Sequence, residues 1–223
     1  MIMLLVKTIS VTMYQQNSRI LMDESQSKAI IVDPGGDVAL ILEQLPSKYI
    51  VESIWITHSH IDHVSGVALL LAELSKLQNI VPEVISHPDD QINRDHLPMQ
   101  SKMMNFAYSG DFSITQYVDH GDRINCGNYE FNVLHTPGHA IGHISFFLAN
   151  DDNQFNTPLL IAGDALFRGS IGRTDLPGGD HALLLTSIRQ HLFTLPEQTV
   201  VLSGHGLNTT IGEEVKTNPF LIS

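Results

Sequence analysis

Four potential metal ligands occupy the six consecutive positions from His58 to His63, directly after the apolar, β-branched run Val51–Thr57. Three imidazoles and a carboxylate packed this closely are costly to fold around unless a cation neutralises and organises them. Imidazole nitrogen and carboxylate oxygen are the donors that zinc and similar divalent metals take. The hexapeptide therefore predicts a metal site, and the density of ligands argues against the ordinary alternative of a polar turn with chance histidines.

Three strand-like runs later in the chain are each followed within a few residues by another ligand type. If these runs share the direction of Ile50–Ile56, their ends meet along one edge, where loops on a rigid scaffold build sites. Glycines beside the three ligands allow the sharp turns that aim a side chain at that edge. The runs are Tyr129–Leu134, Leu159–Ile161 and Thr199–Leu202, and the ligands that follow them are His139, Asp164 and His205.

The number of candidate ligands predicts two metals. One zinc ion takes three or four protein ligands, so seven are too many for one ion and suit two. A carboxylate can bridge two cations, and Asp164 is the best candidate for that position. Two metals about 3.5–4 Å apart can hold a shared hydroxide that attacks a carbonyl carbon. The seven ligands are His58, His60, Asp62, His63, His139, Asp164 and His205.

Composition restricts the class of protein. The 223 residues include 24 acidic and 12 basic side chains, a formal net charge of −12. Phosphate binding needs a basic surface, so nucleic acid is not an expected partner. A hydrophobic content of 43% with 16% charged residues is typical of a globular chain with a sizeable core. Cys126 is the single cysteine, which excludes a thiolate metal cluster.

No run approaches the roughly 18 apolar residues of a membrane span. The apolar segment Met1–Val6 lacks a basic flank and a cleavage site, so we interpret it as a first strand and not as a signal peptide. We therefore expect a cytoplasmic protein, monomer or homodimer, that acts on a small molecule and binds no membrane.

Many short runs of Val, Ile, Leu and Phe, bounded by turn residues, predict strands, and three longer periodic segments predict helices. This mixture favours a layered α/β sandwich formed by one domain over residues 1–223. The predicted helices are Val64–Leu77, Ala182–Leu192 and, more weakly, Asp90–Phe106. The predicted strands are Leu4–Ser10, Asn17–Met22, Ala29–Val32, Ile50–Ile56, Glu83–Ser86, Thr115–Val118, Tyr129–Leu134, Ile144–Leu148, Leu159–Ile161 and Thr199–Leu202, with a hairpin around Cys126-Gly127-Asn128.

The order of these motifs resembles that of the metallo-β-lactamase superfamily. His-x-His-x-Asp-His is followed by Thr-Pro-Gly-His, Gly-Asp and Gly-His-Gly, and Asp33-Pro34-Gly35-Gly36 precedes them all. The resemblance implies a four-layer αβ/βα sandwich with the site along its edge. It assigns His58, His60 and His139 to one metal. Asp62, His63 and His205 bind the other, Asp164 bridges the two, and both aspartates take part in catalysis.

The stretch from Arg168 to Asp175 resembles the glyoxalase II branch, in its short bacterial form, as do Gly204–Gly206 and Asn218–Phe220. This resemblance implies hydrolysis of a small thioester such as S-lactoylglutathione to a hydroxy acid and glutathione. Hydroxide would add to the thioester carbonyl, and the thiolate leaves without a strong general acid. We expect two divalent ions, zinc first, with iron or manganese as alternatives.

Departures from the longer glyoxalase II form concern substrate binding. That form has a C-terminal helical domain that supplies glutathione contacts, and we expect no such domain beyond the hydrolase domain of residues 1–223. A tyrosine expected to touch glutathione aligns with Phe146, and a lysine expected near its carboxylate aligns with Arg173. Arg168 is a further candidate for substrate binding. Arg173 is equally suited to a structural ion pair with Asp175.

Two other functions remain open from the sequence. The persulfide dioxygenases share the fold and a Gly-Arg-Thr-Asp segment, and they use one iron held by two histidines and an aspartate. A metal-binding module without turnover is the alternative of another class, although structural zinc sites are usually closed and four-coordinate.

Seven histidines lie outside the ligand set, and most are expected on the surface or in ordinary hydrogen bonds. His143, four residues after His139, is the candidate for orienting a ligand from behind. Asp33 is expected mainly to shape its turn, with contact to a ligand as the lesser possibility. Cys126 is expected to be a small apolar filler. The other histidines are His87, His96, His120, His135, His181 and His191.

Overall fold

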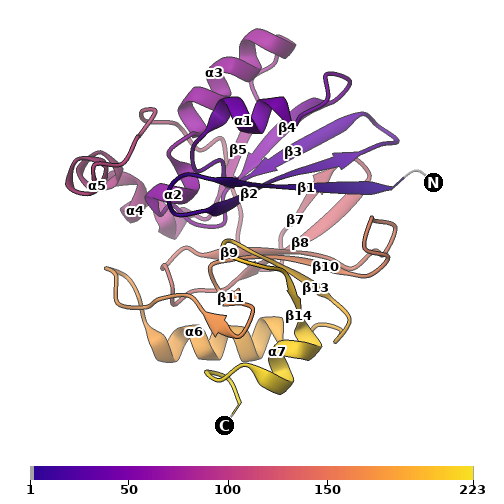
Figure 1. Ribbon diagram of the computed structural model, residues 1–223, viewed down its shortest axis with the longest axis vertical. Helices are drawn as coiled ribbons and strands as arrows, with labels where there is room; N and C mark the ends of the chain where they lie inside the picture. Colours follow the sequence, from indigo (N-terminus) through magenta and orange to yellow (C-terminus); the bar gives the residue numbers. More distant parts are fainter. Residues whose placement is uncertain (1–2, 223) are drawn as a thin grey trace.

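A computed structural model describes residues 3–222. Two six-stranded sheets stack face to face, and helices cover the outer face of each sheet (Figure 1). The arrangement is the single-domain, four-layer α/β sandwich that the sequence predicts. Met1 and Ile2, part of the expected first strand, lie outside the described residues. No helix among residues 3–222 is long and apolar enough to cross a membrane.

The first sheet has the order β1-β2-β3-β4-β5-β6. β1 and β2 form an antiparallel hairpin, and β3, β4, β5 and β6 run parallel to one another. Parallel neighbours place the carboxyl ends of β4 and β5 at the same edge, where His58 and His87 follow. The strands are β1 (Leu4–Val11), β2 (Gln16–Asp23), β3 (Lys28–Val32), β4 (Ile50–Trp55), β5 (Glu83–Ser86) and β6 (Gln116–Tyr117).

The second sheet has the order β14-β13-β10-β9-β8-β7. β10 is parallel to β13, and both β8 and β10 are antiparallel to β9, so β8, β10 and β13 share one direction. Their carboxyl ends therefore meet at one edge. The strands are β7 (Arg123–Cys126), β8 (Tyr129–His135), β9 (Ile144–Leu148), β10 (Leu159–Gly163), β13 (Val200–Ser203) and β14 (Thr209–Thr210). The short ribbon of β11 (Leu166–Phe167) and β12 (Ser170–Ile171) follows β10.

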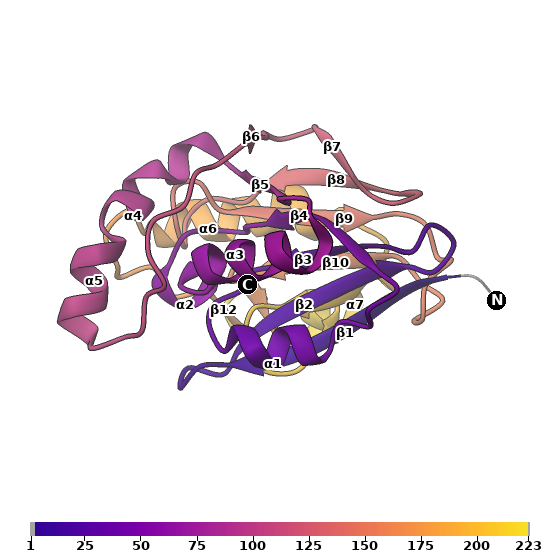
Figure 2. The same cartoon turned by 90° about the horizontal axis from the view of Figure 1, so that it is seen from above.

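Helices α1, α2 and α3 lie against the first sheet, and α6 and α7 lie against the second (Figure 1). Helices α4 and α5 extend from one end of the sandwich (Figure 2). The bounds are α1 (Val38–Glu43), α2 (Ile61–Val64), α3 (Val67–Gln78), α4 (Gln91–Asp95), α5 (Leu97–Met104), α6 (His181–Ser187) and α7 (Ile211–Thr217).

Three apolar layers hold the four structural layers together. The middle layer joins the two sheets, where Trp55 meets the rings of Phe131 and Phe146 at centroid distances of 5.1 Å each. The layer between the first sheet and its helices contains Ile54 and Leu70, and the layer behind the second sheet contains Leu184. Successive residues of each strand alternate between these layers, because side chains of a strand point to opposite faces.

The observed helices are interrupted at positions where the predicted helices continue. The segment predicted as Val64–Leu77 is interrupted at Ser65-Gly66, because Gly66 donates its N–H to the carbonyl of Pro34. Leu77, the last residue of the predicted helix, is 70% exposed. Asp90–Phe106 splits ahead of Pro98, which cannot continue a preceding helical hydrogen-bond ladder. Ala182–Leu192 begins as α6 and ends in a π-helical turn from residue 188.

Candidate metal centre

The seven predicted ligands converge at one edge of the sandwich, from loops of both sheets. The loop after β4 in the first sheet carries His58, His60, Asp62 and His63. The loops after β8, β10 and β13 in the second sheet carry the others. The sequence expectation of a common strand direction holds within the second sheet, and the facing of the two sheets brings the fourth loop to the same place.

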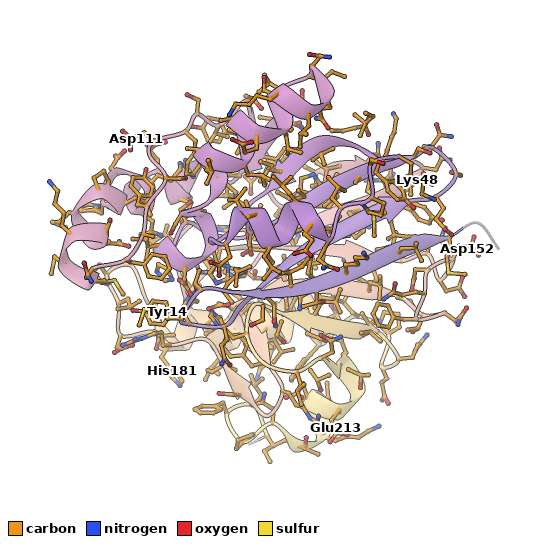
Figure 3. The ribbon with its side chains drawn as sticks, turned by 45° about the horizontal axis from the view of Figure 1, so that its top comes forward. Tyr14, Lys48, Asp111, Asp152, His181 and Glu213 are labelled. Carbon is orange, nitrogen blue, oxygen red and sulfur yellow. The ribbon has the colours of Figure 1, made fainter. Side chains whose placement is uncertain are left out.

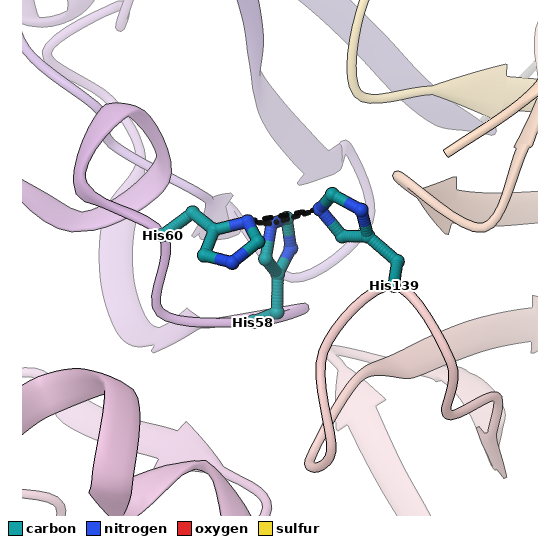
Figure 4. A group of neighbouring side chains, drawn as sticks. All are labelled: His58, His60 and His139. Carbon is teal, nitrogen blue, oxygen red and sulfur yellow. Dashed lines mark hydrogen bonds between the residues drawn. The ribbon is translucent and has the colours of Figure 1, made fainter. Parts of the chain in front are cut away.

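His58, His60 and His139 form the first cluster (Figure 4). His58 Nε2 lies 3.1 Å from His60 Nδ1, His60 Nδ1 lies 2.9 Å from His139 Nε2, and the two Nε2 atoms of His58 and His139 lie 3.1 Å apart. A neutral imidazole has one N–H, so three nitrogens at these distances cannot satisfy one another unless their hydrogens point inward.

The hydrogens of two of these rings point outward. His139 Nδ1 lies 2.7 Å from the carbonyl oxygen of Arg173, which can only accept, so Nδ1 carries the proton and Nε2 has a bare lone pair. Thr57 Oγ1 donates to Asp33 at 2.6 Å, so it accepts from His58 Nδ1 at 3.1 Å. His58 Nε2 is therefore bare as well. Two lone pairs that face each other at 3.1 Å repel unless a cation lies between them.

Asp62, His63 and His205 form the second cluster. His205 Nε2 lies 3.2 Å from Asp62 Oδ2, and His63 Nε2 lies 4.0 Å from the same oxygen. Asp164 lies between the clusters: its Oδ1 is 3.4 Å from His63 Nε2, and its Oδ2 is 3.6 Å from both His139 Nε2 and His205 Nε2. The carboxylate expected to bridge thus touches ligands of both groups.

The outer nitrogens of the second cluster are also held by acceptors. His63 Nδ1 donates to Asp33 Oδ2 at 2.9 Å, and His205 Nδ1 donates to the carbonyl of Tyr14 at 3.1 Å. Tyr14 lies in the loop between β1 and β2, on the left in Figure 3. His63 Nε2 and Asp164 Oδ1 are buried and have no hydrogen-bond partner among the described residues. A divalent cation is the partner that bare imidazole nitrogens and carboxylate oxygens share, so the residues fit metals.

The first cluster and the bridging carboxylate have the charges that this chemistry requires. Burial would raise the pKa of Asp164, but His63 and His139 outweigh it and hold that pKa well below its ordinary range. Burial lowers the pKa of His58 well below the ordinary value, and it lowers that of His60 to about 3, with His139 adding to the shift. The first cluster is therefore neutral imidazole beside an ionised carboxylate, the protonation states that metal ligation requires. In the second cluster burial would lower the pKa values of His63 and His205, but neighbouring carboxylates outweigh it and raise both, so a metal would displace a proton there.

His143 supports the bridging carboxylate from behind. Its Nε2 accepts a hydrogen bond from the backbone N–H of Asp164 at 3.0 Å, and its Nδ1 lies 2.8 Å from Thr136 Oγ1. Gly163, with φ +50°, brings the backbone so close that a Cβ there would lie 2.6 Å from His143 Nε2. His143 thus contacts the backbone of the candidate bridging residue, and its role in orienting a ligand stays a prediction.

Two buried aspartates lie near the site: Asp33, for which the sequence suggested a ligand contact only as the lesser possibility, and Asp90, to which it assigned no role. Asp33, expected mainly as a turn residue, accepts hydrogen bonds from Thr57 N at 2.7 Å and from Thr57 Oγ1, and it orients His63. Its position at the end of β3, ahead of Pro-Gly-Gly, was the available signal. Asp90 lies behind Ser59, and burial raises its pKa to about 6 although the Ser59 hydroxyl and N–H oppose that rise.

The structure separates the three expected substrate contacts. Phe146 is fully buried between the sheets against Trp55, so the expectation that its ring contacts substrate is wrong: its strand turns this residue toward the middle layer. Arg173 forms a bidentate ion pair with Asp175, with both N···O distances 2.7 Å. Arg168 is exposed and has no ion pair within residues 3–222.

Comparison with known proteins places the chain in a family. The model of the metallo-beta-lactamase superfamily matches residues 14–205, which include all seven candidate ligands. The chain is 34% identical over 221 residues to the hydroxyacylglutathione hydrolase GloC of Haemophilus influenzae, and the match covers 98% of each protein.

Solved structures give the same result. BLEG-1, a B3 metallo-beta-lactamase, is 33% identical with a TM-score of 0.83, and the match covers 98% of this chain and all of that one. TTHA1623, solved in a di-iron-bound form, is 31% identical with a TM-score of 0.78, over 96% of this chain and 100% of that chain. Matching motifs, ligand geometry and full-length similarity together establish that this chain belongs to the metallo-beta-lactamase superfamily, as a metal-dependent hydrolase.

Proposed function

We propose that the chain is a binuclear hydrolase of small thioesters, of which S-lactoylglutathione is the leading candidate. The observation that carries the proposal is the pair of clusters whose histidines point bare nitrogens at each other and at the bridging carboxylate of Asp164. The similarity to GloC over nearly the full length supports the choice of a glutathione thioester.

Partners outside the ligand set hold several of the candidate ligands in a fixed orientation. Asp33 holds His63, the carbonyls of Tyr14 and Arg173 hold His205 and His139, and the remaining ligands lie among them. Two divalent cations at such ligands supply a nucleophile derived from water at neutral pH and polarise a carbonyl group. Ionised Asp164 lies between the two clusters, with its Oδ2 3.6 Å from both His139 Nε2 and His205 Nε2. Its loss would therefore remove a ligand from both clusters.

The chain needs no strong general acid for this reaction. The leaving group of a thioester is a thiolate whose conjugate acid has a pKa near 8.5–9, far below that of an alcohol or amine. Arg168 and Arg173 are the two cationic side chains beside the site loops that we propose for the carboxylates of glutathione. Arg173 would exchange Asp175 for substrate, which costs little because the pair is exposed to water.

The test combines metal analysis with two activity assays on the same purified protein. We expect two metal ions per chain, hydrolysis of S-lactoylglutathione and no oxygen uptake with glutathione persulfide. One iron per chain with oxygen uptake would instead support the dioxygenase alternative. Metal binding without either activity would support a non-catalytic module.

A matched pair of variants connects the activity to the centre. Asp164→Asn removes one charge from both clusters and should lower kcat by a factor of at least about 100, since ligand and ligand-orienting changes have effects of that size. Asp151→Asn makes the same chemical change on an exposed loop and should leave kcat as it is. Equal activity in the two variants would contradict the proposal.

A further inference from the structure

Four of the seven histidines outside the metal centre gather in one place, although the sequence gives them no common motif. The rings of His87 and His135 stack at a centroid distance of 4.2 Å, and those of His120 and His191 lie 4.6 Å apart. The backbone N–H of His135 donates to His120 Nδ1, which joins the two pairs. His87, His120 and His135 lie at or just past the ends of β5, β6 and β8, and His191 lies in the turn that follows α6.

An aspartate completes a set of donors there. Asp119 follows β6, and its Oδ1 lies 3.2 Å from His87 Nε2. One donor atom from each of His87, Asp119 and His135 lies within 4.8 Å of the other two. Two imidazoles and a carboxylate at this spacing are the ligands of an open transition-metal site, which leaves further positions to water.

His135 keeps one ring nitrogen with a lone pair that a metal could use. Its Nε2 lies 2.9 Å from the carbonyl oxygen of Ile141, which can only accept, so Nε2 carries the proton and Nδ1 keeps its lone pair. A backbone carbonyl that holds the outer N–H is the usual support of a metal-bound histidine, and His139 has the same arrangement with Arg173 in the main centre.

His87 requires one proton to move. The backbone N–H of Asp89 donates to its Nδ1 at 3.2 Å, so Nε2 carries the hydrogen that faces Asp119. The Asp89 carboxylate lies 4.0 Å from the same Nδ1 and is largely exposed, so a side-chain rotation lets it accept an Nδ1–H. That exchange frees Nε2 for a metal and gives His87 the carboxylate partner that Asp33 provides for His63.

The geometry points to a third metal site: we propose that His87, Asp119 and His135 bind one divalent transition-metal ion, separately from the seven-ligand centre. The two rings are only 12° from parallel, so one must turn about χ2, a soft torsion in histidine, before both lone pairs meet one ion. Imidazole ligands select zinc, cobalt, nickel or copper over calcium and magnesium. Burial, and the neighbouring His135, lower the pKa of His87 and favour the neutral ring that ligation needs.

The test is equilibrium dialysis of the full-length protein against zinc buffers, followed by metal analysis. At nanomolar free zinc the main centre fills and bound zinc reaches a plateau. Raising free zinc to the micromolar range should add one further ion per chain. The added ion is counted above the plateau, so the result is independent of whether the main centre holds one metal or two and of what it hydrolyses.

Variants assign the added ion to the cluster. Asp119→Asn and His135→Gln should each lose the increment and keep the plateau, and His181→Gln, an exposed histidine at the start of α6, should keep both. Asp119 is 70% exposed in its side chain, so its variant tests the site even if His135→Gln folds poorly. The absence of an increment in the unchanged chain, its persistence in Asp119→Asn, or an equal increment with magnesium would each overturn the proposal.

Discussion

The position of a single hydrogen on each imidazole determines what the centre can bind. His58, His63, His139 and His205 all direct an N–H away from the site, toward a hydroxyl, a carboxylate or a backbone carbonyl. Their inner nitrogens face one another or a carboxylate, which is where a metal would bind. The partners outside the ligand set therefore decide the metal affinity together with the ligands themselves.

Asp33→Asn tests this at one residue. An amide can present its N–H to His63 Nδ1, which reverses the tautomer and removes the lone pair from Nε2. We expect a loss of metal affinity of about 10–100-fold, the usual size for a ligand's orienting partner. Competition with a chromophoric chelator measures it. An affinity equal to that of the unchanged chain would show that the hydrogen bond to His63 does not control binding.

Asp90 gives a prediction about pH. Burial raises its pKa from 3.8 to about 6, so between these values the folded chain holds more protons than the unfolded chain. Stability contributed by the neutral carboxyl is present below pH 4 and is lost as pH rises through 6. The rise of the Asp90 pKa from 3.8 to about 6 corresponds to at most about 3 kcal/mol of unfolding free energy.

In Asp90→Asn the side chain is neutral at every pH, so the loss of stability with rising pH that the carboxyl causes should disappear. Chemical denaturation at pH 4 and pH 7, with chelator present in every sample, measures the change in unfolding free energy for both proteins. We expect the decrease from pH 4 to pH 7 to be smaller in the variant. The same decrease in both proteins would mean that the carboxyl does not titrate in this range.

Among the elements, the loop after β13 shows how backbone space positions the centre. Gly204 and Gly206 flank His205, but a Cβ on Gly204 would lie 2.0 Å from Asp164 Oδ1, whereas a Cβ on Gly206 would meet nothing within 4 Å. Gly206 has φ +71°, so a substitution there is strained in its backbone only. Gly204 is therefore required by the lack of space for a side chain, and Gly206 is favoured by its backbone conformation.

The variants Gly204→Ala and Gly206→Ala distinguish steric crowding at the site from backbone strain. Gly204→Ala should displace Asp164 and lose bound metal and activity together. Gly206→Ala should cost about 1–2 kcal/mol of stability and keep its metal, because a left-handed conformation costs a non-glycine residue about that much. Metal analysis and denaturation measure the two effects, and equal metal loss in both variants would refute the distinction.

Element existence was largely predictable, and element ends were not. The strands followed from runs of β-branched residues, but Gly66 ends a helical pattern through a contact with Pro34 that no local periodicity encodes. Helix α7 was missed despite a visible signal: Thr210 and Glu213 have the spacing of a capping box, and Thr210 Oγ1 accepts from the Glu213 N–H. Helix α1 has only six residues, so it is stabilised by packing against the core and not by intrinsic helix propensity.

The features of the candidate site were likewise predictable in part. The candidate ligands, and their gathering at one edge, could be predicted from donor chemistry and spacing, which are properties of the sequence. Roles that depend on which face of a strand a residue occupies did not follow, as the burial of Phe146 and the contact of Asp33 with His63 illustrate. The cluster of His87 and His135 was equally hidden, because it is assembled from two different sheets.

At the scale of the whole molecule, the ligands join the two halves of the sandwich. The loop after β4 belongs to the first sheet, and the loops that carry His139, Asp164 and His205 belong to the second. Neither sheet alone contains a complete set for one metal. The middle apolar layer must therefore be in place before the ligands can meet.

This arrangement has a consequence for folding kinetics. Contacts between residues so distant in the chain form late, because closing long loops is entropically costly before other contacts compensate. Bound metal should then slow unfolding and leave the folding rate nearly unchanged, the behaviour of interactions absent from the transition state. Stopped-flow measurements with and without chelator should show a change confined to the unfolding arm of the chevron plot. The metals would then stabilise the sandwich after it has assembled and would not form part of its folding nucleus.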